Sequence, residues 1–291
     1  MKALRGAALS LLLLGCRRAP DARDTGPVAP EATLTFRVDG RTVRSLSLGA
    51  LAARLGVETI TNLDPYYGRV KSFRAIPLAG VLREGFAGAV EGSLRARMYV
   101  LRAQDGYTVP LAGARLLEGG AYLAVRDVEA PRWQPIGPQQ ASPGPAYLIW
   151  QRADQTSLET HPRPWQLASL EITRFETAFP HTAPEGEAPD GPAWRGYALF
   201  GDLCIRCHAI NRAGGRVGPE LNVPQNITAY RPEAQIRAYI RDPRTFRYGN
   251  MPAHPQLTEA HLDDLLAYLR AMATRPHDPD AAAPPHGAAP P

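Results

Sequence analysis

Residues 204–208 read Cys204-Ile205-Arg206-Cys207-His208, and this short stretch holds two of the three cysteines in the 291-residue chain. A zinc site needs four ligands, and the sequence has no second cysteine pair to supply them. A thioredoxin-like redox pair lies at a strand-to-helix junction in an α/β pattern, which the surrounding residues do not show. The stretch therefore indicates a third kind of site.

Two thiols two residues apart and followed at once by histidine form the pattern through which haem is attached covalently. The thiols of Cys204 and Cys207 reach the two vinyl groups on one edge of a porphyrin, and the imidazole of His208 turns onto the iron. Both thioether bonds and the proximal iron ligand thus come from five residues. We predict one covalent haem c.

The sequence from about residue 193 to residue 275 resembles a small class I cytochrome c. Gly196 and Phe200 precede the motif on a predicted helix, where that family packs a small residue and an aromatic residue against its C-terminal helix. Tyr268 and Leu269 are the matching partners on the last predicted helix. The resemblance implies an all-α cytochrome c fold for residues 193–275.

The resemblance also implies the surroundings of the iron. Gly218-Pro219-Glu220-Leu221 is similar to the family's loop in which a proline carbonyl accepts a hydrogen bond from the proximal histidine, so Pro219 is expected to fix the tautomer of His208. Asn250-Met251-Pro252 matches the family's distal loop, so Met251 is expected as the sixth ligand. The alternative is that Met251 only packs, while His254 or water binds the iron.

The remaining pattern of residues 178–291 fits this domain. Residues 178–192 have little apolar content and are expected to be the linker between the two domains. Apolar periodicity predicts helices over Trp194 to Leu203, Pro232 to Arg241 and Thr258 to Met272, with Thr258 as the N-cap of the last. Residues 276–291 are rich in Ala and Pro and are predicted to be a disordered tail.

Residues 33–177 are predicted to form a β-rich α+β domain, because period-2 alternation recurs between turn residues. Asp39-Gly40 between the first two strands is a hairpin signal. Strands are expected over residues 34–38, 42–46, 68–73, 96–101, 121–127, 147–151 and 167–175, and helical segments over 48–55 and 78–83.

Four stretches of this domain resemble the molybdopterin-binding domain of the sulfite oxidase family. They are Lys71-Ser72-Phe73-Arg74-Ala75-Ile76-Pro77-Leu78, Asp105-Gly106-Tyr107-Thr108-Val109-Pro110, Gly144-Pro145-Ala146-Tyr147-Leu148-Ile149-Trp150 and Pro164-Trp165-Gln166-Leu167. That family holds molybdenum through a cysteine thiolate in this domain, but no cysteine occurs between Arg17 and Leu203. We therefore expect no molybdopterin and interpret the domain as a docking or scaffold module. The alternative is a pterin bound without the usual ligand.

Arg152, His161 and Arg163 cluster in sequence beside Trp150 and Trp165. Such residues can line a pocket for an anion. Arginines are common in this chain and usually exposed, so we interpret the cluster as a surface loop with its arginines in solvent.

The first residues have the features of an exported lipoprotein. Lys2 and Arg5 precede an apolar run that is too short to span a bilayer, so residues 1–15 are predicted to be a signal peptide. The run ends in Leu13-Leu14-Gly15-Cys16, which resembles the lipobox of bacterial lipoproteins, and Cys16 is expected to carry lipid. Residues 16–32 are expected to be a flexible tether. Arg17 is not the acidic residue associated with inner-membrane retention in some bacteria, which favours the outer membrane.

The formal charge of +5 comes from scattered arginines, whereas nucleic-acid binding needs local basic density. The expected partners are redox proteins and, through the lipid, a membrane. The sequence predicts an electron carrier on the periplasmic side of a bacterial membrane, with no catalytic residue assigned. One alternative is a haem-containing oxidoreductase whose N-terminal domain oxidises a small substrate. Another is a haem sensor with an open iron position.

Overall fold

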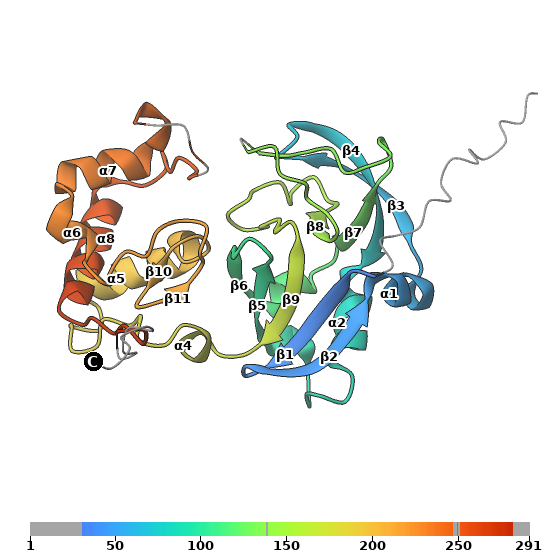
Figure 1. Cartoon of the computed structure of the whole chain (residues 1–291), viewed down its shortest axis with the longest axis horizontal. Helices are drawn as coiled ribbons and strands as arrows, with labels where there is room; N and C mark the ends of the chain where they lie inside the picture. Colours follow the sequence, from blue (N-terminus) through green and yellow to red (C-terminus); the bar gives the residue numbers. More distant parts are fainter. Residues whose placement is uncertain (1–30, 138, 247–248, 250, 282–291) are drawn as a thin grey trace, which may run out of the picture.

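The computed structural model describes residues 31–137, 139–246, 249 and 251–281, and these form two lobes connected through a short helix, α4 (Phe175–Ala178) (Figure 1). The N-terminal lobe is built on two β-sheets and the C-terminal lobe is helical. This agrees with the β-rich and all-α regions expected from the sequence. The signal peptide, Cys16 and nearly all of the tether lie outside the described residues.

The first sheet has the strand order β2-β1-β9-β5-β6. β1 (Thr33–Val38) pairs antiparallel with β2 (Arg41–Ser47) and parallel with β9 (Leu167–Ile172), and β9 pairs antiparallel with β5 (Met98–Ala103). β6 (Thr108–Ala112) forms the edge next to β5. Asp39 and Gly40 both have positive φ, 44° and 80°, as a two-residue type I′ hairpin requires. The predicted hairpin is confirmed.

The second sheet has the order β3-β4-β7-β8 and is antiparallel throughout. Its strands are β3 (Glu58–Asp64), β4 (Arg69–Pro77), β7 (Ala121–Asp127) and β8 (Tyr147–Trp150). The lobe also contains α1 (Leu48–Leu55), α2 (Leu78–Phe86), α3 (Gly113–Leu116) and the 3₁₀ turn η1 (Leu94–Ala96). α1 has the bounds that the sequence predicted. The last predicted strand is too long, because β9 ends at Ile172 and Phe175 begins α4.

Two strands of the N-terminal lobe, β3 and β6, were not predicted, for identifiable reasons. The buried positions of β3 include Asn62 and Asp64, so its inward face does not read as apolar. β6 contains Pro110, which argues against a central strand, and β6 is an edge strand.

The interior of the N-terminal lobe holds polar and charged side chains that are paired with one another. Arg163 is 1% exposed and lies 3.3 Å from Asp64, and His161 is 5% exposed with its Nε2 atom 2.8 Å from Glu118. Buried charges are tolerated when they are paired and hydrogen-bonded. The surface-loop interpretation is therefore wrong for His161 and Arg163, while Arg152 is exposed as expected.

The C-terminal lobe begins with α5 (Pro192–Leu199), which continues as a π-helical turn, η2 (Phe200–Cys204). It contains α6 (Ile227–Tyr230), α7 (Glu233–Arg241), the 3₁₀ turn η3 (Pro243–Thr245) and α8 (Glu259–Ala273), with a small ladder of β10 (Ala209–Ile210) and β11 (Ala213–Gly214). The Oγ1 atom of Thr258 accepts a hydrogen bond from the His261 amide at 3.2 Å. Thr258 is thus the N-cap of α8, as predicted.

Helices α5 and α8 cross in close contact at Gly196. A Cβ atom on Gly196 would lie 2.0 Å from the carbonyl oxygen of Asp264, closer than real Cβ atoms approach. One turn further along the chain, where η2 begins, the rings of Phe200 and Tyr268 lie 5.3 Å apart between centroids. Gly196, Phe200, Tyr268 and Leu269 thus lie at the helix contact implied by the cytochrome c resemblance.

The segments before and after these helices are folded against them. Phe179 and Thr182 are buried, and the hydroxyl of Tyr268 donates to the Thr182 carbonyl at 2.8 Å. The expected linker is therefore packed on the C-terminal lobe. The amide of His277 donates to Asn211 at 3.0 Å and Asp278 pairs with Arg212 at 3.0 Å, so the predicted disordered tail begins too early. Residues 282–291 lie outside the described residues.

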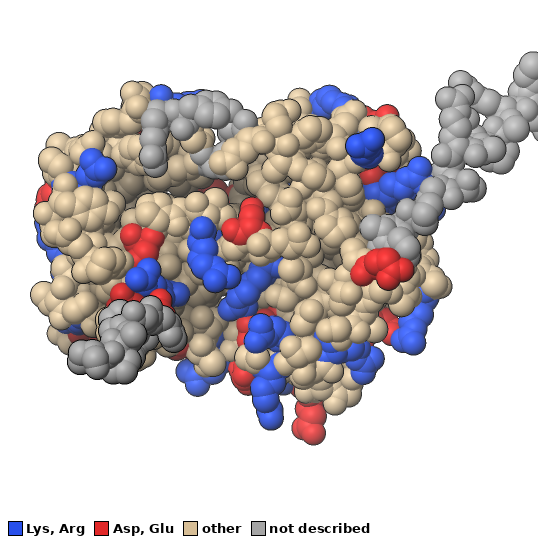
Figure 2. Space-filling model, viewed as in Figure 1, with Lys and Arg blue, Asp and Glu red and all other residues tan. Residues whose placement is uncertain are grey.

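Two surface properties bear on membranes and partners. No helix in the described part of the chain is long and apolar enough to cross a membrane. On the face shown in Figure 2, Lys and Arg side chains are interspersed with Asp and Glu over both lobes.

We expect Gly196→Ala to lower the free energy of unfolding of the C-terminal lobe by about 2–3 kcal/mol, because the added methyl group forces α5 and α8 apart. Urea unfolding followed by tryptophan fluorescence measures the loss. Ala198→Ser, on the exposed side of the same helix, is the control and should change stability by less than about 0.5 kcal/mol. Equal stability of the two variants would contradict the close crossing.

Candidate haem site

The Cys204–His208 segment forms a tight turn at the end of η2. The Ile205 amide donates to the Phe200 carbonyl at 2.8 Å, and the His208 amide donates to the Cys204 carbonyl at 2.9 Å. Ile205 is fully buried in the apolar core of the C-terminal lobe. Because Ile205 anchors the turn in that core, Cys204 and Cys207 are left to line a neighbouring cavity.

This haem cavity, as we call it, has a volume of about 640 Å³. Its walls are mainly apolar and come from α7, α8 and the loops around them. The apolar and aromatic lining includes Phe200, Leu203, Leu221, Ile227, Ile236, Tyr239, Ile240, Leu265 and Leu269. Arg231 and Arg244 also line it, and no carboxylate does so among the described residues. An apolar cavity with two cations suits a flat apolar group that carries carboxylates, as haem does.

His208 is fixed in orientation within this cavity. Its Nδ1 atom donates to the Pro219 carbonyl at 2.8 Å, which is the hydrogen bond implied by the cytochrome c resemblance and leaves Nε2 free to bind a metal. Burial lowers the pKa of His208, against the opposing effect of this hydrogen bond, so the imidazole is held neutral. A Cβ atom on Gly218 would lie 2.5 Å from the imidazole, so this position needs glycine.

The two thiols are unlike those of a reactive dithiol. Burial raises the pKa of Cys204 to about 12 and that of Cys207 to about 11, whereas thiol–disulfide enzymes lower the pKa of their attacking cysteine. Both cysteines are free. The surroundings favour attachment of an apolar group over disulfide exchange.

The structure brings both candidate distal ligands to the same cavity as His208. Met251 and His254 line it, and the His254 amide is held by the Ile240 carbonyl at 3.1 Å. Burial lowers the pKa of His254.

Sequence reasoning missed polar residues of the cavity, namely Gln139, Arg231, Gln235 and Arg244. Arg231 and Arg244 line it from either end of the α7 region, but scattered arginines gave no signal of this. Gln139 reaches the cavity from the N-terminal lobe, and only a three-dimensional structure can show that.

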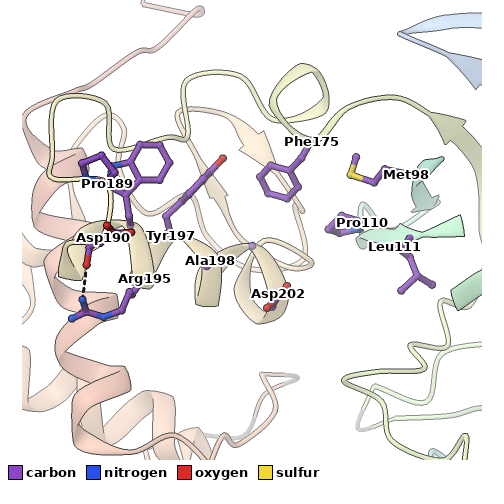
Figure 3. A pocket seen from close by; sticks show the side chains of 13 residues that line it. Met98, Pro110, Leu111, Phe175, Pro189, Asp190, Arg195, Tyr197, Ala198 and Asp202 are labelled. Carbon is purple, nitrogen blue, oxygen red and sulfur yellow. Dashed lines mark hydrogen bonds between the residues drawn. The ribbon is translucent and has the colours of Figure 1, made fainter. Parts of the chain in front are cut away.

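A second cavity, of about 660 Å³, lies between the lobes next to α4. Figure 3 shows Met98, Pro110 and Leu111 of the N-terminal lobe on one side, and Tyr197 and Asp202 of the C-terminal lobe on the other. None of the described residues that line it is a cysteine or a histidine. Across the described residues, no group of three or more His, Cys, Asp or Glu side chains is placed to hold a metal ion.

Comparison with known proteins agrees with this geometry. Residues 193–273 match the family model of cytochrome c. The chain has a cytochrome c domain at its C-terminus. This domain supports haem c as the cofactor of a haem-containing electron-transfer protein.

The chain is also similar to a curated bacterial protein. It is 28% identical over 190 residues to cytochrome c oxidase subunit 2 of Alkalihalophilus pseudofirmus. The matched stretch covers 58% of this chain and 54% of that protein, so it spans about half the length of this curated relative.

Proposed function

We propose that this protein is a monohaem c-type cytochrome lipoprotein that transfers electrons on the extracytoplasmic side of a bacterial membrane. One observation carries the proposal: the Cys204–His208 turn, the histidine fixed by Pro219, and Met251 all line a single apolar cavity.

Each of these residues has a defined role in the proposal. Cys204 and Cys207 form the thioether bonds, His208 is the proximal iron ligand and Met251 is the distal one. The Pro219 carbonyl holds the His208 imidazole and strengthens it as a ligand. The haem, when bound, supplies a one-electron change between ferric and ferrous iron. The apolar walls exclude water and favour the ferrous form, which carries one positive charge less.

The N-terminal lobe is proposed to be a docking or scaffold module. It has no cysteine to hold molybdenum, and its buried Arg163 is already paired with Asp64. Its hairpin between β5 and β6 contacts the haem-binding turn, because the Thr108 amide donates to the Arg206 carbonyl at 2.9 Å. A fused docking module raises the effective concentration of a partner near the haem.

The proposed anchor is lipid on Cys16, after cleavage of the signal peptide. It rests on the apolar run before Cys16 and on the lipobox resemblance. Each buried methylene of the acyl chains contributes roughly 0.8 kcal/mol, so several chains hold a protein at a membrane stably.

Replacement of both Cys204 and Cys207 by Ser should abolish covalent attachment, because a serine hydroxyl does not form the thioether. Haem staining of a denaturing gel measures this. The wild type should stain and the double variant should not. Staining of the double variant would contradict the assigned attachment residues.

Met251→Ala should leave the haem attached, lower its reduction potential and let an added small ligand such as azide bind the iron, since a thioether ligand raises the potential. Redox titration and visible spectra measure both effects. Met98→Ala removes a thioether outside the haem cavity and serves as the control. If His254→Ala reproduces the effect and Met251→Ala has none, His254 is the distal ligand.

Cys16→Ala should move the protein from the membrane fraction to the soluble fraction, because the acyl chains have lost their attachment point. Fractionation of native cells followed by immunoblotting measures this. An unchanged distribution would contradict the lipid anchor.

A further inference from the structure

The haem-binding turn, Cys204–His208, is held by hydrogen bonds from the N-terminal lobe. Besides the hydrogen bond from Thr108 to the Arg206 carbonyl, the Arg216 amide donates to the Gly106 carbonyl at 3.1 Å. Gly106 has φ of +90°, and a Cβ atom there would lie 2.9 Å from the Arg216 side chain. The β5–β6 hairpin thus makes one backbone contact with the haem-binding turn and another with Arg216, which follows that turn, through a close approach that glycine permits.

The side chain of Arg206 is held by the same lobe. Its Nη1 atom donates to the Leu158 carbonyl at 3.0 Å and its Nη2 atom to the Glu159 carbonyl at 2.7 Å. Its Nε atom is buried and has no hydrogen-bond partner among the described residues. A positive charge between the two haem-attaching cysteines is therefore partly buried and is held in place by neutral carbonyl groups.

The segment that supplies these carbonyls is rigidly anchored in the N-terminal lobe. The Trp150 indole donates to the Pro162 carbonyl at 3.0 Å, and His161 lies 2.8 Å from the Glu118 carboxylate. The side chain of Gln256, in the cytochrome c domain, donates to the Glu159 carboxylate. Arg206 is consequently fixed relative to both lobes.

The buried carboxylate nearest to these contacts, Asp64, is already paired with Arg163 at 3.3 Å. The neighbouring phenols are neutral, because burial raises the pKa of Tyr107 to about 12 and that of Tyr66 further still. Asp105 and Glu159 are exposed, so water screens their charges. Arg206 thus keeps a partly buried positive charge next to Cys207, which lines the haem cavity.

We propose that the N-terminal domain holds Arg206 as a fixed, partly buried positive charge beside the haem, and that docking of this domain thereby raises the haem reduction potential. This inference rests on the proposed haem function. Uptake of one electron from a reductant removes one positive charge from ferric iron, so a nearby fixed cation favours the ferrous form. The Coulomb interaction is stronger where water is excluded.

The coupling must act in both directions. If docking of the N-terminal domain favours ferrous iron, then reduction of the iron must strengthen docking by the same factor. The protein would thus expose the haem-binding turn more readily in its oxidised state. This gives the N-terminal domain a role in redox-dependent contact with partners.

The test compares Arg206→Gln, Arg206→Lys and Arg216→Gln by redox titration of the full-length protein. Arg206→Gln should shift the ferric/ferrous ratio at a fixed solution potential roughly tenfold toward ferric iron, equal to about 59 mV for a one-electron couple. Arg206→Lys keeps the charge, so its reduction potential should stay close to that of the wild type. Arg216→Gln makes the same charge change on an exposed side chain that follows β11 and should have little effect.

An unchanged reduction potential in Arg206→Gln overturns the inference. An equal decrease in the reduction potential of Arg206→Lys also overturns it, because it would show that the contacts of Arg206 matter and its charge does not. Hydrogen exchange in the unmodified protein provides a test that needs no variant. The Thr108 and Arg216 amides should exchange more slowly in the ferrous state, and equal rates in the two states overturn the coupling. Absence of covalent haem from the wild type would instead contradict the proposed function.

Discussion

The close crossing of α5 and α8 at Gly196 is the constraint on which the haem site depends. It brings Phe200 against Tyr268 and sets where the chain leaves α5, so that Ile205 enters the core and the two cysteines face the cavity. A side chain at residue 196 cannot be accommodated without moving α8, which also supplies Leu265 and Leu269 to the cavity wall. Helix packing and haem attachment are thus parts of one arrangement.

The elements closest to this crossing were predictable from sequence. The five residues from Cys204 to His208 combine thioether spacing with an iron ligand, and few other sites need that pattern. The helices on either side have regular apolar periodicity, and Thr258 is a strong N-cap. The Pro219 hydrogen bond followed from the cytochrome c resemblance. The preference for Met251 over His254 is still a prediction, because both residues line the cavity.

The rest depended on contacts between residues far apart in the sequence. Burial of Arg163 requires Asp64 nearly one hundred residues away, so local composition wrongly indicated a solvent-exposed loop. Strand β3 was not predicted because polar residues occupy its inward positions. Gln139 contributes to the haem cavity, and Leu158 accepts a hydrogen bond from Arg206, only because the two lobes meet there. The resemblance of the N-terminal lobe to the sulfite oxidase family stays a prediction. Even a similar fold would not imply that family's chemistry here, because the cysteine that holds molybdenum is missing.

The most direct test of the account is the iron and molybdenum content per chain, with the intact mass, of protein purified from its native host. The account predicts one iron per chain and no molybdenum. It also predicts that the mass of the denatured chain is increased by that of one haem, because the haem is covalently attached. A protein with free cysteines and no iron would contradict the central claim that this chain is a c-type cytochrome. Stoichiometric molybdenum would contradict the docking role of the N-terminal domain and indicate an enzyme.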